Sequence, residues 1–116
     1  MSKALRYNKD KIDWSVLDVD FYEAQELEYE ARMYGVEKYT IEAEGIDGLT
    51  NWKSSIGTED HEGFMLGCLE SANRHLRALR RGEYTDHESG IPHVGFIRVN
   101  MGMFQYYFSR WNTKST

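Results

Sequence analysis

The sequence predicts an all-α fold: a compact bundle of about three to five helices, in a single domain spanning residues 1–116. Three observations lead to this prediction. The chain has one proline among 116 residues, apolar residues recur at three- and four-residue spacing over long stretches, and polar segments containing glycine separate those stretches. At 41% hydrophobic residues, a chain of this length can bury one core. We therefore expect helices joined by two longer polar loops.

The first predicted helix runs from about Asp18 or Asp20 to Tyr39 and follows an irregular segment at residues 5–15. Its apolar stripe, at helical spacing, consists of Phe21, Ala24, Leu27, Ala31 and Tyr34. A line of acids on a neighbouring face consists of Glu23, Glu26, Glu30 and Glu37. The segment that follows, about residues 40–57, is long for a connection within a small domain, which indicates a functional or mobile loop.

Two more helices are predicted in the second half of the chain. The first starts after Thr58, a good N-cap residue, and continues to about Arg81, where Gly82 stops it. The next begins near Pro92, which suits a first helical turn. Its two apolar lines predict a central helix or one packed against a second subunit, so we expect a homo-oligomer.

Composition excludes several classes of function. The formal net charge of -5 disfavours a general nucleic-acid binder, which needs a basic surface, so no direct nucleic-acid binding is expected. The lone Cys68 forbids an internal disulfide, and neither a signal segment nor a membrane span is apparent. These features predict a cytoplasmic protein.

The stretch from residue 83 to residue 100 holds the densest group of side chains able to bind metal or phosphate. Carboxylates that can meet if this loop folds back on the preceding helix are Glu70, Glu83, Asp86 and Glu88. Such oxygen ligands suit Mg²⁺ or Mn²⁺. Loop acids are also commonly just solvated, and this alternative stays open for each of them.

Other polar residues have one functional and one structural interpretation. Arg74 can grip phosphate oxygens or form an intrahelical pair with Glu70. His75, His93 and Asn100 can serve a site or satisfy buried neighbours. Lys38 can offset phosphate charge and Trp52 can stack on a base, or both can be ordinary surface and core residues.

A series of short motifs occurs in a fixed order. These are Arg6-Tyr7-Asn8, Lys11, Trp14-Ser15, Gly35-Val36-Glu37-Lys38-Tyr39, Asn51-Trp52-Lys53, Glu70 with Arg74-His75, Gly82-Glu83, Asp86-His87-Glu88-Ser89-Gly90-Ile91-Pro92-His93, and Asn100. The series covers nearly the whole chain and resembles the small dATP/dGTP diphosphohydrolases of phages and bacteria. That resemblance implies a MazG-like helical fold and divalent-metal-dependent cleavage of purine deoxynucleoside triphosphates to monophosphate and pyrophosphate.

Together, residues and resemblance define a predicted site. Catalysis is assigned to Glu70, Arg74 and His93, and contact with the purine nucleotide to Lys38, Asn51, Trp52, Arg74, His75 and Asn100. An alternative metal location is the acid pair of Glu23 and Glu26, with Glu30, whose spacing is typical of MazG-like enzymes.

Two positions depart from the family pattern: Phe96 stands where a second histidine is usual, and Glu70 where an aspartate is usual. Asn73 also ends a four-residue step where an acid is expected. Phe96 and Asn73 favour a rival hypothesis, an inactive phage protein that sequesters a nucleotide or a nucleotide-derived signal. A third hypothesis is a structural assembly module built on the aromatic last helix.

Overall fold

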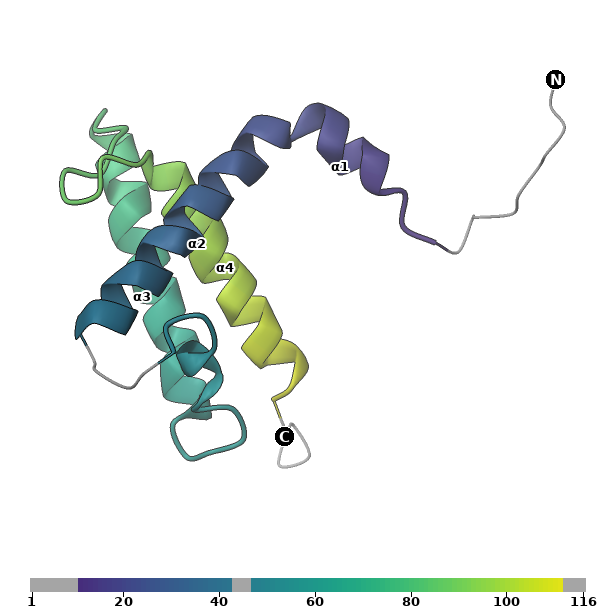
Figure 1. Cartoon of the computed structure of the whole chain (residues 1–116), viewed down its shortest axis with the longest axis vertical. Coiled ribbons are helices and arrows are strands. Elements are labelled where there is room, and N and C mark those ends of the chain that lie inside the picture. Colours follow the sequence, from purple (N-terminus) through teal and green to yellow (C-terminus); the bar gives the residue numbers. More distant parts are fainter. Residues whose placement is uncertain (1–10, 43–46, 112–116) are drawn as a thin grey trace, which may run out of the picture.

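The structure, a computed structural model, describes residues 11–42 and 47–111. Its elements in chain order are α1 (Trp14–Asp20), α2 (Tyr22–Glu42), the short 3-10 helix η1 (Asn51–Lys53), α3 (His61–Arg80) and α4 (His93–Ser109). Figure 1 shows these helices, and the described residues contain no β-strand beyond an isolated bridge between Thr85 and Pro92. The predicted all-α fold is confirmed.

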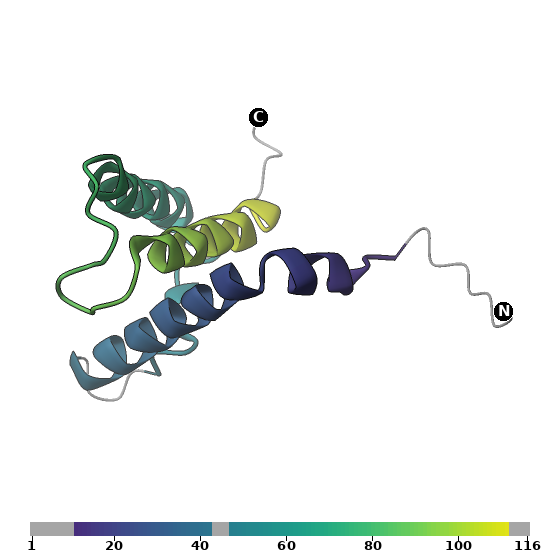
Figure 2. The ribbon, with the colours of Figure 1, turned by 90° about the horizontal axis from the view of Figure 1, so that it is seen from above.

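Helix α4 lies in the middle of the bundle. Both α2 and α3 pack on α4, whereas no close backbone contact joins α2 to α3 in the described part of the chain. Figure 2 shows α4 between the other two helices. Gly95 permits the close approach of α2, because a Cβ atom there would collide with the carbonyl oxygen of Leu27. The central position of α4 thus leaves a space flanked by α2 and α3.

The N-terminal half begins its helices earlier than predicted. Residues 5–10 of the predicted irregular segment lie outside the described residues, but Trp14 and Ser15 are helical. The cause is Asp13, whose carboxylate accepts a hydrogen bond from the Ser15 backbone at 3.1 Å and caps α1. A break at Phe21, with φ -121° and ψ 23°, then separates α1 from α2.

The boundaries of α3 also differ slightly from the prediction. Thr58 does not cap the helix, which begins at His61. The Thr58 hydroxyl instead accepts a hydrogen bond from the backbone N–H of Asp60 within a turn. At the other end Gly82, with φ +84°, adopts the left-handed conformation that terminates a helix, as predicted.

The core is small for the number of apolar residues. The buried apolar side chains are Ala31, Met65, Cys68, Ala72, Ala78 and Tyr107. Helix α1 buries no residue and projects from the bundle, and Val19 on it is 78% exposed. In the described ranges no helix is long and apolar enough to cross a membrane. The bundle therefore leaves much apolar surface uncovered, above all on α1.

Candidate functional site

A cavity of about 790 Å³ opens between α2 and α3. Helix α4 contributes Phe96, Val99 and Asn100 to its lining, and residues of the two loops, among them Trp52 and Asp86, complete it. A volume of this size lies within the range of ordinary small-molecule sites. The predicted site residues are therefore expected to line this cavity.

Most of the predicted site residues line this cavity. They are Lys38, Asn51, Trp52, Arg74, His75, Asp86, Glu88 and Asn100. Among the described residues, three predicted members are absent from its lining: Glu70, Glu83 and His93. Glu70 is exposed on α3, Glu83 pairs with Arg81 at 2.6 Å, and His93 is buried. The roles assigned to all these residues remain predictions.

The loop that delivers Asp86 and Glu88 is held by its own hydrogen bonds. The N–H of Asp86 donates to the carbonyl of Ile91 at 2.9 Å, and the N–H of His93 donates to Tyr84 at 2.9 Å. Gly90 has φ +76°, a conformation that side chains other than hydrogen rarely allow. The Ser-Gly-Ile-Pro sequence thus folds back on itself and fixes the start of α4.

One end of the cavity is rich in charged groups. The Nζ of Lys38 lies 2.9 Å from Oε1 of Glu88, which also accepts a hydrogen bond from the Tyr34 hydroxyl at 2.9 Å. The hydrogen bonds from Lys38 and Tyr34 lower the pKa of the Glu88 carboxyl. Arg74 adds an exposed guanidinium to the same lining. This end can neutralise an anionic ligand, because such a ligand can replace Glu88 as the partner of Lys38.

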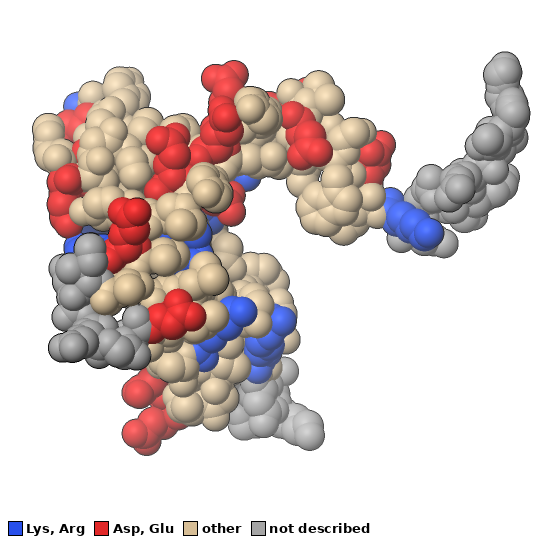
Figure 3. Space-filling model, viewed as in Figure 1, with Lys and Arg blue, Asp and Glu red and all other residues tan. Residues whose placement is uncertain are grey.

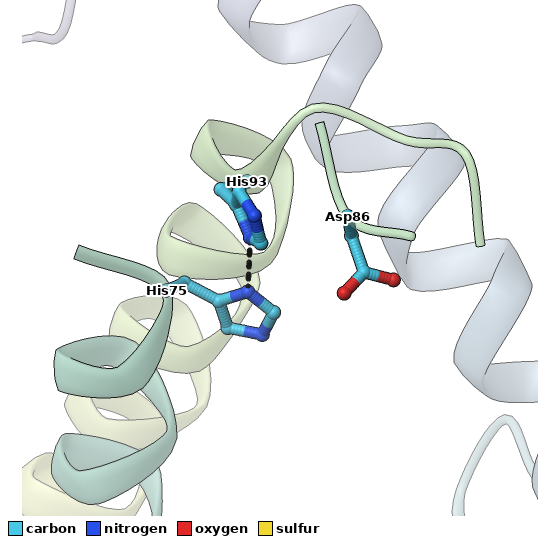
Figure 4. A group of neighbouring side chains, drawn as sticks. All are labelled: His75, Asp86 and His93. Carbon is cyan, nitrogen blue, oxygen red and sulfur yellow. Dashed lines mark hydrogen bonds between the residues drawn. The ribbon is translucent and has the colours of Figure 1, made fainter. Parts of the chain in front are cut away.

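Two histidines and an aspartate meet at this charged end (Figure 4). The Nδ1 atoms of His75 on α3 and His93 on α4 are 2.7 Å apart, so one of them donates and the other accepts. Burial, the neighbouring His93 and Arg74 all lower the pKa of His75, despite an opposing effect from Asp86. One hydrogen bond thus joins the two rings through their Nδ1 atoms.

Asp86 is fixed as a carboxylate. Burial raises its pKa, but hydrogen bonds from the backbone N–H and the hydroxyl of Ser89 to Oδ2, at 2.9 Å and 2.8 Å, together with the nearby His75 and His93, leave the pKa below its ordinary value. One ligand atom from each of Asp86, His75 and His93 lies within 4.8 Å of the others. Within the described residues, this is the group of side chains best placed to hold a metal ion.

The other end of the cavity is aromatic. The ring of Trp52 lies 5.0 Å from that of Tyr106 and 6.4 Å from that of Phe64, measured between centroids. Its indole N–H donates to the carbonyl of Leu49 at 3.1 Å. Arg32 covers Trp52 at 5.8 Å from the ring centroid. Trp52 is thus both a packed residue and part of the lining, so the two sequence interpretations are compatible.

Part of the wall that α3 presents to the cavity consists of small residues. Gly63, Gly67 and Ser71 recur every four residues along it, and Gly35 lies on the opposing α2. A Cβ atom at Gly63, Gly67 or Gly35 would meet nothing within 4 Å. Sequence reasoning missed these residues, although the four-residue spacing of small residues on one helix face was a readable signal.

Phe96, one of the two residues that depart from the family pattern, is part of the lining. Its ring stacks on His75 at 4.9 Å and an interplanar angle of 10°, and meets Tyr34 edge-on at 6.0 Å. Asn100, one turn further, donates from Nδ2 to the Phe96 carbonyl at 2.8 Å. Phe96 therefore sets the orientation of His75 by packing against it.

The alternative acid group lies elsewhere. Glu26 and Glu30 line a separate, shallow hollow together with Tyr22, Gln25 and Tyr29. Figure 3 shows acidic side chains spread along α1 and α2. The described acids of α2 form no cluster of metal-ligand geometry with one another. The acids of α2 thus do not converge on one point in the way that His75, Asp86 and His93 do.

Fold and site together define a small all-α protein with an open pocket that is charged at one end and aromatic at the other. The chain belongs to the family described as dATP/dGTP diphosphohydrolase, N-terminal, whose model matches residues 1–115. This confirms the resemblance seen in the motifs. Searches among curated proteins and among solved structures gave no match.

Proposed function

We propose that the pocket binds a purine deoxynucleoside triphosphate, dATP or dGTP, and that the protein hydrolyses it to monophosphate and pyrophosphate in the presence of Mg²⁺ or Mn²⁺. The family supports a nucleotide substrate. The observation that carries the proposal is the polarity of the pocket. From Phe64 at the aromatic end to His75 at the charged end, α3 advances eleven residues, or about 16 Å.

The phosphates belong at the charged end. Arg74 can form two parallel hydrogen bonds to phosphate oxygens, a geometry that lysine cannot reproduce. Lys38 is already near, held by Glu88, and a phosphate can compete for its ammonium group. The chain as a whole carries a net charge of -5, so these local cations must supply the attraction.

The base belongs at the aromatic end. Trp52 offers a ring face or edge, and stacking on an aromatic ring contributes about 1–3 kcal/mol per base. The Oδ1 of Asn100 can accept a hydrogen bond from a base edge while its Nδ2 is held by Phe96. The bare wall formed by Gly63 and Gly67 leaves room for the flat purine and the sugar.

A bound divalent ion would neutralise phosphate charge and position the attacking water. Of the carboxylates assigned to metal binding, Asp86 and Glu88 line the pocket and so fit this role. Ser89 aims the Asp86 carboxylate, and the hydrogen bond between His75 and His93 provides a place for a proton close to it.

Turnover is the direct test of this proposal. The protein is incubated with one deoxynucleoside triphosphate at a time, with Mg²⁺ or Mn²⁺, and the products are separated by ion-exchange chromatography. We expect monophosphate and pyrophosphate from dATP or dGTP. The absence of both hydrolysis and thermal stabilisation with every purine nucleotide would contradict the proposal.

The rival function is sequestration of a nucleotide without hydrolysis. Phe96 favours it, because an apolar ring fills the position beside His75 where the family usually has a second imidazole. In that case the nucleotide would be recovered intact after tight binding without metal. The same pocket serves both functions, so product analysis separates them.

We also propose that the protein acts in the cytoplasm as a homo-oligomer that does not bind nucleic acid directly. The net charge of -5 supports the absence of nucleic-acid binding. The apolar surface of α1 supports the homo-oligomer, since Trp14 is 62% exposed and Val19 78% exposed. A second copy of the chain is the partner best suited to cover it. Sedimentation should show a dimer or larger species, and Val19→Asp should yield monomers; a monomeric wild-type protein would contradict this.

A further inference from the structure

We propose that His75, Asp86 and His93 form a binding site for a borderline divalent transition-metal ion such as Zn²⁺ or Co²⁺, at the charged end of the pocket. The sequence analysis assigned the metal to carboxylates, and none of the comparisons assigns this site. The inference concerns the proposed pocket but does not require nucleotide hydrolysis.

The donors come from three separate elements. His75 lies on α3, Asp86 on the loop after it, and His93 at the first turn of α4. Their ligand atoms fall within 4.8 Å of one another, and Figure 4 shows the carboxylate and both rings around one region. Bonds of about 2.0–2.2 Å to a common ion require these side chains to move closer together than they lie here.

The donor set selects the ion. Mg²⁺ prefers oxygen ligands and retains several waters, whereas two imidazole nitrogens and one carboxylate oxygen suit Zn²⁺, Co²⁺, Mn²⁺ or Fe²⁺. The two Nδ1 atoms already point toward each other across 2.7 Å, so a cation can take the place of the proton in that hydrogen bond. One carboxylate then offsets half of the charge of a divalent ion.

The surroundings hold the donors in place. Ser89 donates twice to Oδ2 of Asp86, Phe96 stacks on His75, and His93 is buried with 7% of its surface exposed. Outer partners of this kind orient metal ligands. His75 and Asp86 also line the cavity, so an ion held by them would be accessible from the pocket.

The competing interpretation is a metal-free polar cluster in which the hydrogen bond between the imidazoles is purely structural. Titration of the chelator-treated full chain with Zn²⁺, in the absence of nucleotide, distinguishes the two. Calorimetry should give one ion per chain with a dissociation constant on the order of micromolar or lower. Co²⁺ should give visible d–d absorption without a thiolate charge-transfer band, because Cys68 is outside the group.

Single substitutions identify the residues that bind the metal ion. Asp86→Asn keeps the side-chain shape, and His75→Phe keeps a ring against Phe96; each should weaken Zn²⁺ binding at least about 10-fold, and Ser89→Ala by about 10-fold. His87→Ala is the matched control in the same loop and should leave affinity unchanged. Circular dichroism checks that each variant is folded.

Absence of saturable binding below about 1 mM would overturn the proposal. Equal affinity in wild type, Asp86→Asn and His75→Phe would also overturn it, because the ion would then sit elsewhere. The outcome is separate from the proposed activity. Mg²⁺-supported hydrolysis without Zn²⁺ binding would contradict the transition-metal site and support the proposed hydrolysis. Zn²⁺ binding without turnover would support the site and contradict the hydrolysis.

Discussion

The two ends of the pocket are built in different ways. At the aromatic end Trp52, Phe64 and Tyr107 pack on one another, and the Tyr107 hydroxyl donates to the Trp52 carbonyl. At the charged end the polar groups come from α2, α3 and the loop before α4, and they contact one another through hydrogen bonds and ion pairs. The aromatic end is part of the packed core, whereas the charged end consists of polar side chains that surround the open cavity.

This difference indicates where change is tolerated. Removing a ring at the aromatic end costs packing as well as ligand contact, because buried aromatic side chains dominate core energetics. An exposed ion pair at the charged end, such as that of Lys38 with Glu88, adds little to stability. Substitutions at the charged end should therefore separate binding from folding, which makes that end the better place to test function.

The largest effect is expected from blocking the space between the ends. A Cβ atom at Gly67 meets nothing within 4 Å, so Gly67→Leu should place a side chain in the pocket without a backbone clash. Leucine favours the helix over glycine by about 1 kcal/mol, so the melting temperature should not fall. Nucleotide affinity, measured by calorimetry, should drop about 100-fold or more.

Gly102→Leu on α4 is the matched control, because a Cβ atom there also meets nothing and Gly102 does not line the pocket. It should bind nucleotide like the wild type. Equal binding by Gly67→Leu and wild type would show that the ligand uses another surface.

Removing the guanidinium at the charged end should have the next largest effect. Arg74→Ala should weaken triphosphate binding by about 10- to 100-fold, since a hydrogen bond to a charged group contributes about 1.5–3 kcal/mol. Arg74→Lys should recover only part of the loss. Monophosphate affinity should change less, and fluorescence titration with each nucleotide measures both.

Arg77→Ala provides the comparison, because Arg77 is exposed on α3 and does not line the pocket. A loss of the same size in both variants would mean that only the general positive charge of the helix matters.

A smaller effect is expected for base selection. Asn100→Leu removes the carboxamide that we assign to the base edge, so the ratio of dATP to dGTP affinity should change by about 10-fold, as for one lost hydrogen-bonding group. The preference for triphosphate over monophosphate should stay the same. Competition binding with both bases checks this, and an unchanged base ratio would remove Asn100 from recognition.

The smallest effect concerns Cys68, which lines the pocket with 5% of its surface exposed. Burial raises the pKa of its thiol to about 11. Because the thiolate is the reactive form, alkylation by iodoacetamide should be slow at pH 8 and should accelerate about tenfold per pH unit until the pKa is approached. Bound nucleotide should slow it further. A rate that levels off near pH 9 would contradict this environment.

The helices were predictable because the signals were local. The apolar spacing of α2, the stop at Gly82 and the start at Pro92 each depend on residues within a few positions of one another. The break at Phe21 was missed because Asp13 caps a separate short helix ahead of it. Local capping competed with the periodic pattern and determined where α1 begins.

The site was predictable as a collection of residues but not as an arrangement. Sequence reasoning placed Asp86 and Glu88 with Glu70, whereas the structure brings Asp86 to His75 and His93 and leaves Glu70 exposed outside the lining. Such a choice depends on the rotation of α3 relative to α4. That rotation is set by packing between helices, which no motif in one segment records.

The central claim is that phosphates lie at the His75 end and the base at the Trp52 end of one pocket. A crystal structure with Mn²⁺ and a non-hydrolysable dATP analogue tests it most directly. We predict phosphate oxygens within hydrogen-bonding distance of Arg74, the adenine against Trp52 and Asn100, and an anomalous Mn²⁺ peak beside Asp86. A nucleotide bound on the acidic face of α2, around Glu26 and Glu30, would contradict the account.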